Sequence, residues 1–198
     1  ITPRVADMLQ AYPPVKVEVS LYGMTAGTYE SITQVTGSYA RCLEGISLLL
    51  ERGIRLNLKT MLMTLNRHEL DNMQTYAENL GVDFRFDPML NPAIGGERFP
   101  LTYRLSPAEI VEFDKRDGRR MEEWQALSDR MVGKTRPTRR LYNCGAGLHI
   151  FHIDPYGMMS FCSLPKDPKL RYNLKRGSFQ QGWEEFIPSL SRTIKKTD

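Results

Sequence analysis

Strand-like and helix-like segments alternate through the N-terminal half of this chain, and that order constrains the fold more than any other feature. Residues 15–21 alternate valine with polar side chains, which predicts a strand that ends in a loop at Gly23. Residues 38–52 place leucine and isoleucine on one helical face, with Ser38 as the expected cap and Gly53 where a glycine ends the helix. These two segments predict a strand followed by a helix.

The segments that follow repeat this pattern. Residues 54–61 predict a second strand, and residues 82–86 predict a third. Between them, Asn66 and Glu69 have the spacing of a reciprocal helix cap, and Gly81 ends the apolar stripe that follows. Because short connections join strand to helix to strand, we expect parallel strands with right-handed crossovers, which is an α/β fold.

The C-terminal half has a different organisation. Ser106 and Glu109 form a capping box that opens one or two amphipathic helices. Residues 133–141 are basic and lack apolar periodicity, which predicts a linker. We therefore expect one domain at residues 1–132 and another at residues 142–198.

The second predicted domain contains a hairpin signal. Residues 149–154 and residues 157–162 have strand-like composition and meet at the tetrapeptide Asp154-Pro155-Tyr156-Gly157, which is typical of a turn. A short helix is predicted at residues 183–190. This part of the chain is therefore expected to begin as a β-hairpin.

The composition narrows the function classes. With 27 Lys and Arg against 23 Asp and Glu, the net charge of +4 suits an anionic ligand or a partner peptide, and we expect no nucleic acid partner. No apolar run is long enough to cross a bilayer, so we expect no membrane partner and a cytoplasmic location. The three cysteines do not form a secreted disulfide framework. A first residue of Ile indicates a chain that begins within a longer protein.

Polar side chains stand near the carboxyl ends of the predicted strands. They are Ser20 on the first strand, Lys59 on the second, and Arg85 and Asp87 on the third, and we expect them to converge on one rim. Ser20 can donate to a hydroxyl or a carboxylate, while Arg41 and Lys59 can hold a carboxylate through charge-assisted hydrogen bonds. The alternative is that these are ordinary polar strand ends and solvated surface charges.

Two cysteines enclose the predicted hairpin, with Gly157 between them. Thiolates are soft ligands for iron or zinc, and the turn can return Cys162 toward Cys144. Two sulfurs do not fill a four-ligand site. His149 and His152 offer a Cys2His2 zinc site as a rival, but their separation of three residues puts them on opposite faces of a strand, which disfavours a shared metal.

At this point the sequence resembles a known family. The segments VEVSLYG, GSYARCLEGISLLLERGIRLNLKTMLMTLNRHEL and LGVDFRFDP resemble the later strands and helices of radical S-adenosylmethionine enzymes. The segment YNCGAGLHIFHIDPYGMMSFC resembles the opening of their auxiliary-cluster extension, the SPASM domain. The resemblance implies the C-terminal half of a partial (β/α)6 barrel, followed by the hairpin of an incomplete SPASM domain.

The resemblance also implies roles for individual residues. Ser20 would contact the ribose or methionyl part of S-adenosylmethionine, Arg41 would bind its carboxylate, and Lys59 is a weaker candidate. Cys144 and Cys162 would ligate an auxiliary four-iron, four-sulfur cluster. Relatives with this extension modify peptides or proteins through a 5′-deoxyadenosyl radical that removes a hydrogen atom from the substrate.

The sequence also departs from the family pattern. The Cys-x3-Cys-x2-Cys motif for the first cluster, the glycine-rich strand motif and the later SPASM cysteines are absent. The chain is therefore expected to be a fragment that is inert by itself and that leaves a sheet edge free for dimerisation. The alternatives are a non-catalytic module that binds a peptide and a small structural zinc domain.

Overall fold

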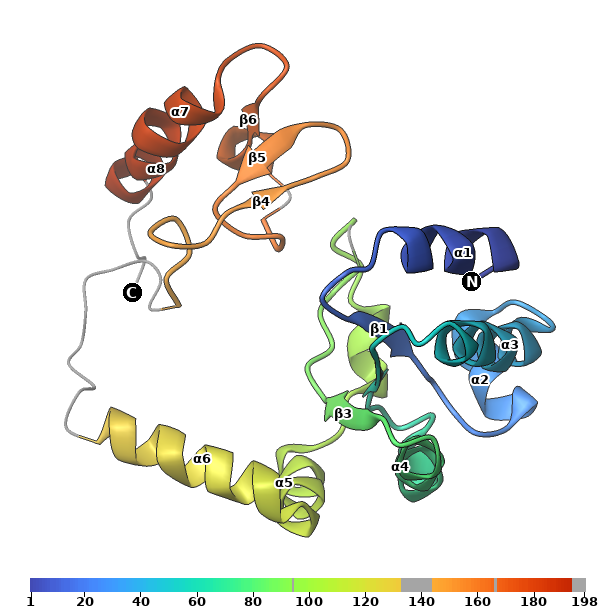
Figure 1. The fold of residues 1–198 in the computed structure, drawn as a ribbon. Helices are drawn as coiled ribbons and strands as arrows, with labels where there is room; N and C mark the ends of the chain where they lie inside the picture. Colours follow the sequence, from blue (N-terminus) through green and yellow to red (C-terminus); the bar gives the residue numbers. More distant parts are fainter. Residues whose placement is uncertain (94, 133–143, 166, 194–198) are drawn as a thin grey trace. The chain divides into compact units, whose positions relative to one another are not determined.

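The computed structural model in Figure 1 describes the chain in stretches, which are residues 1–93, 95–132, 144–165 and 167–193. The chain divides into two compact units, Ile1–Arg120 and Met121–Asp198. The predicted linker at residues 133–141 lies outside the described residues. Within the described stretches, no helix has both the length and the apolar character needed to span a membrane.

The first unit alternates helices and strands along the chain. Its elements are α1 (Pro3–Ala11), β1 (Val17–Ser20), α2 (Ala26–Thr33), α3 (Ser38–Glu51), β2 (Leu56–Met61), the 3-10 turn η1 (Arg67–Glu69), α4 (Leu70–Asn79), β3 (Asp83–Asp87), the 3-10 turn η2 (Phe99–Tyr103) and α5 (Pro107–Arg116). Helix α6 (Gly118–Met131) begins in this unit and continues in the second.

The three strands of the first unit form one parallel sheet. Strand β2 lies in the middle and pairs in parallel with β1 and with β3, so the predicted parallel arrangement is confirmed. The register sets Ser20 opposite Lys59, and Lys59 opposite Arg85. Because side chains of a strand alternate between the two faces, these three side chains belong to the same face.

The other face of the sheet carries the hydrophobic core. Leu58 from β2 packs with Ile46 and Leu49 from α3 and with Met73 from α4, and all four are almost fully buried. Figure 1 shows α3 and α4 beside the strands. The sheet therefore has one face covered by helices and one face with polar side chains.

The helix ends differ in part from the sequence prediction. Gly53 and Gly81 end α3 and α4 with φ of +66° and +67°, as expected of stop glycines. Ser38 does not cap α3: it is the first helical residue, because Gly37 at φ +73° occupies the cap position and the Ser38 hydroxyl bonds Thr33 Oγ1 at 2.7 Å.

The predicted reciprocal cap at the start of α4 is wrong. Neither Asn66 nor Glu69 makes a side-chain capping bond to its own helix. Both side chains instead bond to the loop after β1, which is close in space and distant in sequence. Helices α1 and α2 are not among the predicted helices, and each is short and buries a single side chain.

The second unit contains a small antiparallel sheet. Its elements are β4 (His152–Ile153), β5 (Met158–Ser160), the 3-10 turn η3 (Pro168–Leu170), β6 (Tyr172–Asn173), α7 (Phe179–Gln181), the π-helical turn η4 (Gly182–Phe186) and α8 (Ile187–Thr193). Strands β4 and β5 pair antiparallel around Gly157 at φ +82°, which confirms the hairpin. Strand β4 is shorter than predicted, because the chain before it turns back on itself through bonds such as that from Gly147 N to Ile150 O at 2.9 Å.

Candidate functional site

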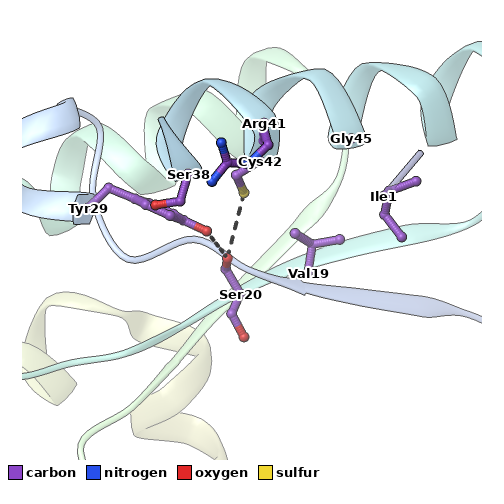
Figure 2. A pocket seen from close by; sticks show the side chains of 8 residues that line it. All are labelled: Ile1, Val19, Ser20, Tyr29, Ser38, Arg41, Cys42 and Gly45. Atoms are coloured by element: carbon purple, nitrogen blue, oxygen red, sulfur yellow. Dashed lines mark hydrogen bonds between the residues drawn. The ribbon is translucent and has the colours of Figure 1, made fainter. Parts of the chain in front are cut away.

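A cavity of about 270 Å³ lies at the carboxyl end of β1, against α2 and α3. Figure 2 shows the residues that line it, which are Ile1, Val19, Ser20, Tyr29, Ser38, Arg41, Cys42 and Gly45. Two of the three residues predicted to bind a cofactor, Ser20 and Arg41, therefore meet at one cavity.

Ser20 presents different groups to the two sides of the strand. Its carbonyl oxygen faces α3 and accepts hydrogen bonds from the Tyr29 hydroxyl at 3.4 Å and from the Cys42 thiol at 3.8 Å. Its hydroxyl points away from α3 in Figure 2, toward the polar face of the sheet. Ser20 therefore turns its carbonyl toward Tyr29 and Cys42 and its hydroxyl toward the polar face of the sheet.

Arg41 supplies positive charge to the cavity. Its side chain lies on the exposed side of α3, and Nη2 donates to the carbonyl oxygen of Thr36 at 3.2 Å. A guanidinium has five N–H donors, so this bond leaves donors for an anion. One guanidinium nitrogen of Arg41 is therefore fixed by Thr36, and the remaining N–H groups can donate to a ligand.

Tyr29 and Cys42, which line the cavity between Ser20 and Arg41, are uncharged near neutral pH. Burial raises the pKa of the Tyr29 hydroxyl above its ordinary value, and the neighbouring Cys42 raises it further. Burial also raises the pKa of the Cys42 thiol, against a smaller opposing effect of Tyr29. Both side chains stay protonated, so they donate hydrogen bonds and do not act as anions.

Lys59 lies outside this cavity. Its ammonium donates to Glu18 Oε2 at 3.2 Å on the polar face of the sheet. Arg85 donates to the same carboxylate through Nε at 3.1 Å and Nη2 at 3.0 Å. Hydrogen bonds from Arg85 and then Lys59 lower the pKa of Glu18 to about 2. The sequence prediction omitted Glu18, although its position two residues before Ser20 places both on one face.

The loop that follows Ser20 is fixed by Asn66, which is fully buried. Its amide nitrogen donates to Tyr22 O at 3.1 Å and to Met61 O at 3.1 Å, and its amide oxygen accepts from Met63 N at 2.9 Å. The side chain thus joins the loop after β1 to the loop after β2.

Glu69 holds the same loop one turn further on, and its side chain is almost fully buried. Its carboxylate accepts from Thr25 N at 3.2 Å, from Thr25 Oγ1 at 2.7 Å, from Thr28 Oγ1 at 2.5 Å and from Met24 N. Burial raises the pKa of Glu69, but the bonds from Thr28, Thr25 and Met24 outweigh burial and lower it overall. Sequence reasoning missed this role because the spacing of Asn66 and Glu69 matches a local cap.

Three of the four predicted rim residues lie together. Ser20, Lys59 and Arg85 occupy successive strands in register. Asp87 is separate in function, since its Oδ1 accepts from Met89 N at 2.8 Å and fixes the turn after β3.

The two hairpin cysteines carry free thiols. Cys144 is exposed, and Cys162 is half-buried against the apolar cluster around Met159 and Phe161. In the described stretches, no group of three or more Cys, His, Asp or Glu side chains is placed to hold a metal. The described residues therefore do not assemble a Cys2His2 zinc site from His149 and His152.

Comparisons with known proteins bear on the family. No protein-family model matches the sequence. The chain is 25% identical over 163 residues to a probable GTP 3′,8-cyclase of Aeropyrum pernix, which covers 82% of this chain and 42% of that protein. It is 26% identical over 202 residues to mycofactocin maturase MftC of Mycobacterium tuberculosis, covering 99% of this chain and 51% of that protein. The chain is homologous to radical S-adenosylmethionine enzymes.

The solved structures agree with this radical S-adenosylmethionine homology at the level of fold. Native anSMEcpe with bound AdoMet superposes with a TM-score of 0.62 and 14% identity, covering 98% of this chain and 58% of that chain. A polyhistidine-tagged form of anSMEcpe with bound AdoMet gives a TM-score of 0.61 at 13% identity. The chain spans about half the length of the curated relatives it matches.

Proposed function

We propose that this chain is part of a radical S-adenosylmethionine enzyme that modifies a peptide or a protein. The observation that carries the proposal is the meeting of Ser20 and Arg41 at one cavity at the carboxyl end of a parallel strand, where α/β folds bind ligands. The homology to a maturase supports the substrate class. Residues 1–132 would be the C-terminal half of a partial (β/α)6 barrel with its trailing helices.

The cavity residues suit S-adenosylmethionine. Arg41 would bind the methionyl carboxylate with its free guanidinium donors, and Ser20 would bind the ribose or methionyl part through its hydroxyl. Lys59 is the third proposed contact, from the polar face beside Ser20. The protonated Tyr29 and Cys42 hold the Ser20 carbonyl and add no negative charge that would repel the carboxylate.

When bound beside a reduced iron-sulfur cluster, S-adenosylmethionine would supply the chemistry for removing a hydrogen atom from the substrate, and Ser20 and Arg41 would hold it. This sequence lacks the Cys-x3-Cys-x2-Cys ligands for that cluster, so the isolated chain is proposed to be inert. Its own residues bind and orient the cofactor.

Cys144 and Cys162 are proposed ligands of an auxiliary four-iron, four-sulfur cluster in a SPASM hairpin. The turn at Gly157 and the antiparallel β4–β5 pair support this assignment. The described residues do not complete a four-ligand set, because only these two thiols belong to the second unit. The remaining ligands of the cluster would come from outside the described residues.

Isothermal titration calorimetry of the full chain with S-adenosylmethionine tests the proposal. Arg41→Gln removes a charge-assisted contact and is expected to weaken binding about ten- to a hundred-fold. Ser20→Ala should weaken it less, since a neutral hydrogen bond is lost. Arg55→Gln is the matched control, because Arg55 is an exposed arginine at the opposite end of β2. Absence of binding by the wild type, or equal loss in Arg55→Gln, would refute the cavity assignment.

The outer edge of β1 supports a further part of the proposal, which is self-association. Among the described residues, β1 pairs on one side only, with β2. Exposed strand edges offer unpaired backbone groups to a second chain. Light scattering after gel filtration should therefore give a mass above that of a monomer, and a concentration-independent monomer would exclude dimerisation through this edge.

A further inference from the structure

Arg85 and Lys59 form a basic pair on the polar face of the sheet, in the row that begins with Ser20. Neighbouring strands lie about 4.8 Å apart, so the two side chains arise next to each other. The Arg85 side chain is 48% exposed and that of Lys59 is 37% exposed, against 27% for Glu18 between them. The cations are thus more accessible than the carboxylate that holds them.

Three cationic side chains lie around the Glu18 carboxylate. Glu18 accepts from both Arg85 and Lys59, so one carboxylate serves two cations. Lys16 lies 4.0 Å from the same carboxylate. The low pKa of Glu18 keeps it ionised, and the bidentate bond fixes the plane of the Arg85 guanidinium. Arg85 and Lys59 thus present fixed positive groups that can donate hydrogen bonds to an anionic ligand.

Donors remain for such an anion. Glu18 uses the Nε hydrogen and one Nη2 hydrogen of Arg85, and one hydrogen of Lys59. From the five donors of a guanidinium and the three of an ammonium, this leaves both Nη1 hydrogens, one Nη2 hydrogen and two ammonium hydrogens. Since the Nη1 and Nη2 groups form one side of the fork, they match the two oxygens of a carboxylate.

Acidic neighbours limit the charge of the ligand. Asp83 and Asp87 lie two residues on either side of Arg85 on the same strand face, about 7 Å along the strand. Their carboxylates oppose a multiply charged ligand such as a triphosphate. A ligand with a single carboxylate suits the positive groups of Arg85 and Lys59. At this position it would lie next to Ser20, where the cofactor is proposed to bind.

We propose that Arg85 binds a carboxylate of the substrate peptide and that Glu18, which also accepts from Lys59, positions the Arg85 guanidinium for it. The inference rests on the proposed peptide-modifying function, which it deepens by naming the chemical group that is recognised. The preferred substrate is therefore a peptide that places an acidic side chain or a free C-terminal carboxylate beside Arg85.

The test uses the full chain and synthetic peptides that are identical except for one carboxylate. Acetylated and amidated pentapeptides carry Glu or Gln at the centre, and a third peptide carries Gln with a free C-terminal carboxylate. Affinities are measured from NMR chemical-shift changes. We expect the Glu peptide or the free-end peptide to bind about ten-fold more tightly than the amidated Gln peptide. The tighter of the two identifies the source of the carboxylate.

Variants assign the preference to Arg85. Arg85→Gln should abolish it, and Arg85→Lys should retain part of it, because an ammonium keeps the charge and loses the fork. Arg55→Gln, a charge change at the other end of β2, should retain all of it. Equal binding of the three peptides by the wild type, a preference that survives in Arg85→Gln, or tighter binding of GTP than of either carboxylate peptide would overturn the proposal.

The measurements distinguish a failure of the proposed function from a failure of the carboxylate site at Arg85. A wild-type chain that binds no S-adenosylmethionine but prefers the carboxylate peptide would overturn the proposed function and leave the anion site. A chain that binds S-adenosylmethionine and shows no carboxylate preference would remove the anion site alone. Circular dichroism of Arg85→Gln and Arg85→Lys checks that each variant is folded before its affinity is interpreted.

Discussion

The side chain of Glu69 accepts a hydrogen bond from the Thr25 hydroxyl at 2.7 Å, across 44 residues of sequence. Thr25 is the cap of α2, and its backbone N–H donates to the same carboxylate at 3.2 Å. Since Thr25 lies in the connection that leaves β1, this one carboxylate fixes the path of the chain after Ser20. The geometry of the cavity beside Ser20 thus depends on a residue of the neighbouring loop.

Replacing Glu69 is expected to destabilise the chain. Glu69→Ala leaves the N–H of Thr25 and the hydroxyls of Thr25 and Thr28 without their acceptor, at a cost of about 1–3 kcal/mol in the free energy of unfolding. Urea unfolding followed by circular dichroism measures the change. The control is Glu78→Ala, an exposed glutamate whose loss should change stability by less than about 0.5 kcal/mol. Equal effects of both substitutions on the free energy of unfolding would contradict the proposal that Glu69 fixes the loop after β1.

Two glycines of the first unit form a matched test of backbone strain. A Cβ added to Gly53 or to Gly27 meets no heavy atom within 4 Å, but Gly53 has φ of +66° and Gly27 lies within α2. Gly53→Ala should therefore destabilise by about 1–2 kcal/mol through conformation alone. Gly27→Ala should stabilise by about 0.5–1 kcal/mol because alanine favours a helix. Thermal unfolding compares them, and a shift of the same sign in both would reject the assigned φ at Gly53.

Local signals in the sequence predict much of the first unit. Alternation over residues 15–21 and 54–61 predicts β1 and β2, and the stop glycines Gly53 and Gly81 predict the helix ends. These signals succeed because a strand face and a left-handed glycine are determined within a few residues. Helix α2 lacks such a signal, because it is short and buries only Tyr29.

The candidate site is less predictable. A spacing of three residues between Asn66 and Glu69 has the same appearance whether the side chains cap their own helix or bond another loop. The fold decides, by bringing the loop after β1 within reach. Glu18 likewise resembles any solvent-facing strand residue until the register sets Lys59 and Arg85 beside it. Partners from distant segments therefore limit what the sequence reveals.

The Glu18 cluster should be visible in the pH dependence of stability. The pKa of Glu18 is lowered from 4.5 to about 2, first by the hydrogen bond from Arg85 and then by that from Lys59. Because the folded-state pKa lies below the unfolded value, the stabilisation is present above pH 4.5 and is lost as pH falls through about 2. Carbon-13 NMR of the side-chain carboxyl should give a midpoint near 2.

A variant tests the cause of that shift. Arg85→Gln removes the first of the two donors, so the Glu18 midpoint should rise toward its ordinary value of 4.5. Lys115→Gln is the control, since Lys115 pairs with Glu112 on α5. A wild-type midpoint near 4.5, or an unchanged midpoint in Arg85→Gln, would contradict the cluster geometry.

Arg120 protects the outer edge of β3 and gives the last prediction. Its Nη1 donates to Phe86 O at 3.1 Å, its guanidinium lies 4.0 Å from the Phe86 ring centroid, and its Nε donates to the buried Asp114 at 2.8 Å. Backbone groups on an edge strand otherwise invite pairing with another chain. Arg120→Gln loses the charge-assisted bond and should destabilise the chain by about 1.5–3 kcal/mol while increasing aggregation on heating.

The control is Arg116→Gln, which loses an exposed contact 5.0 Å from the Phe113 ring and should cost less than about 1 kcal/mol. Thermal unfolding with light scattering distinguishes the two, and an Arg120→Gln chain as stable and as soluble as Arg116→Gln would show that β3 needs no such cover.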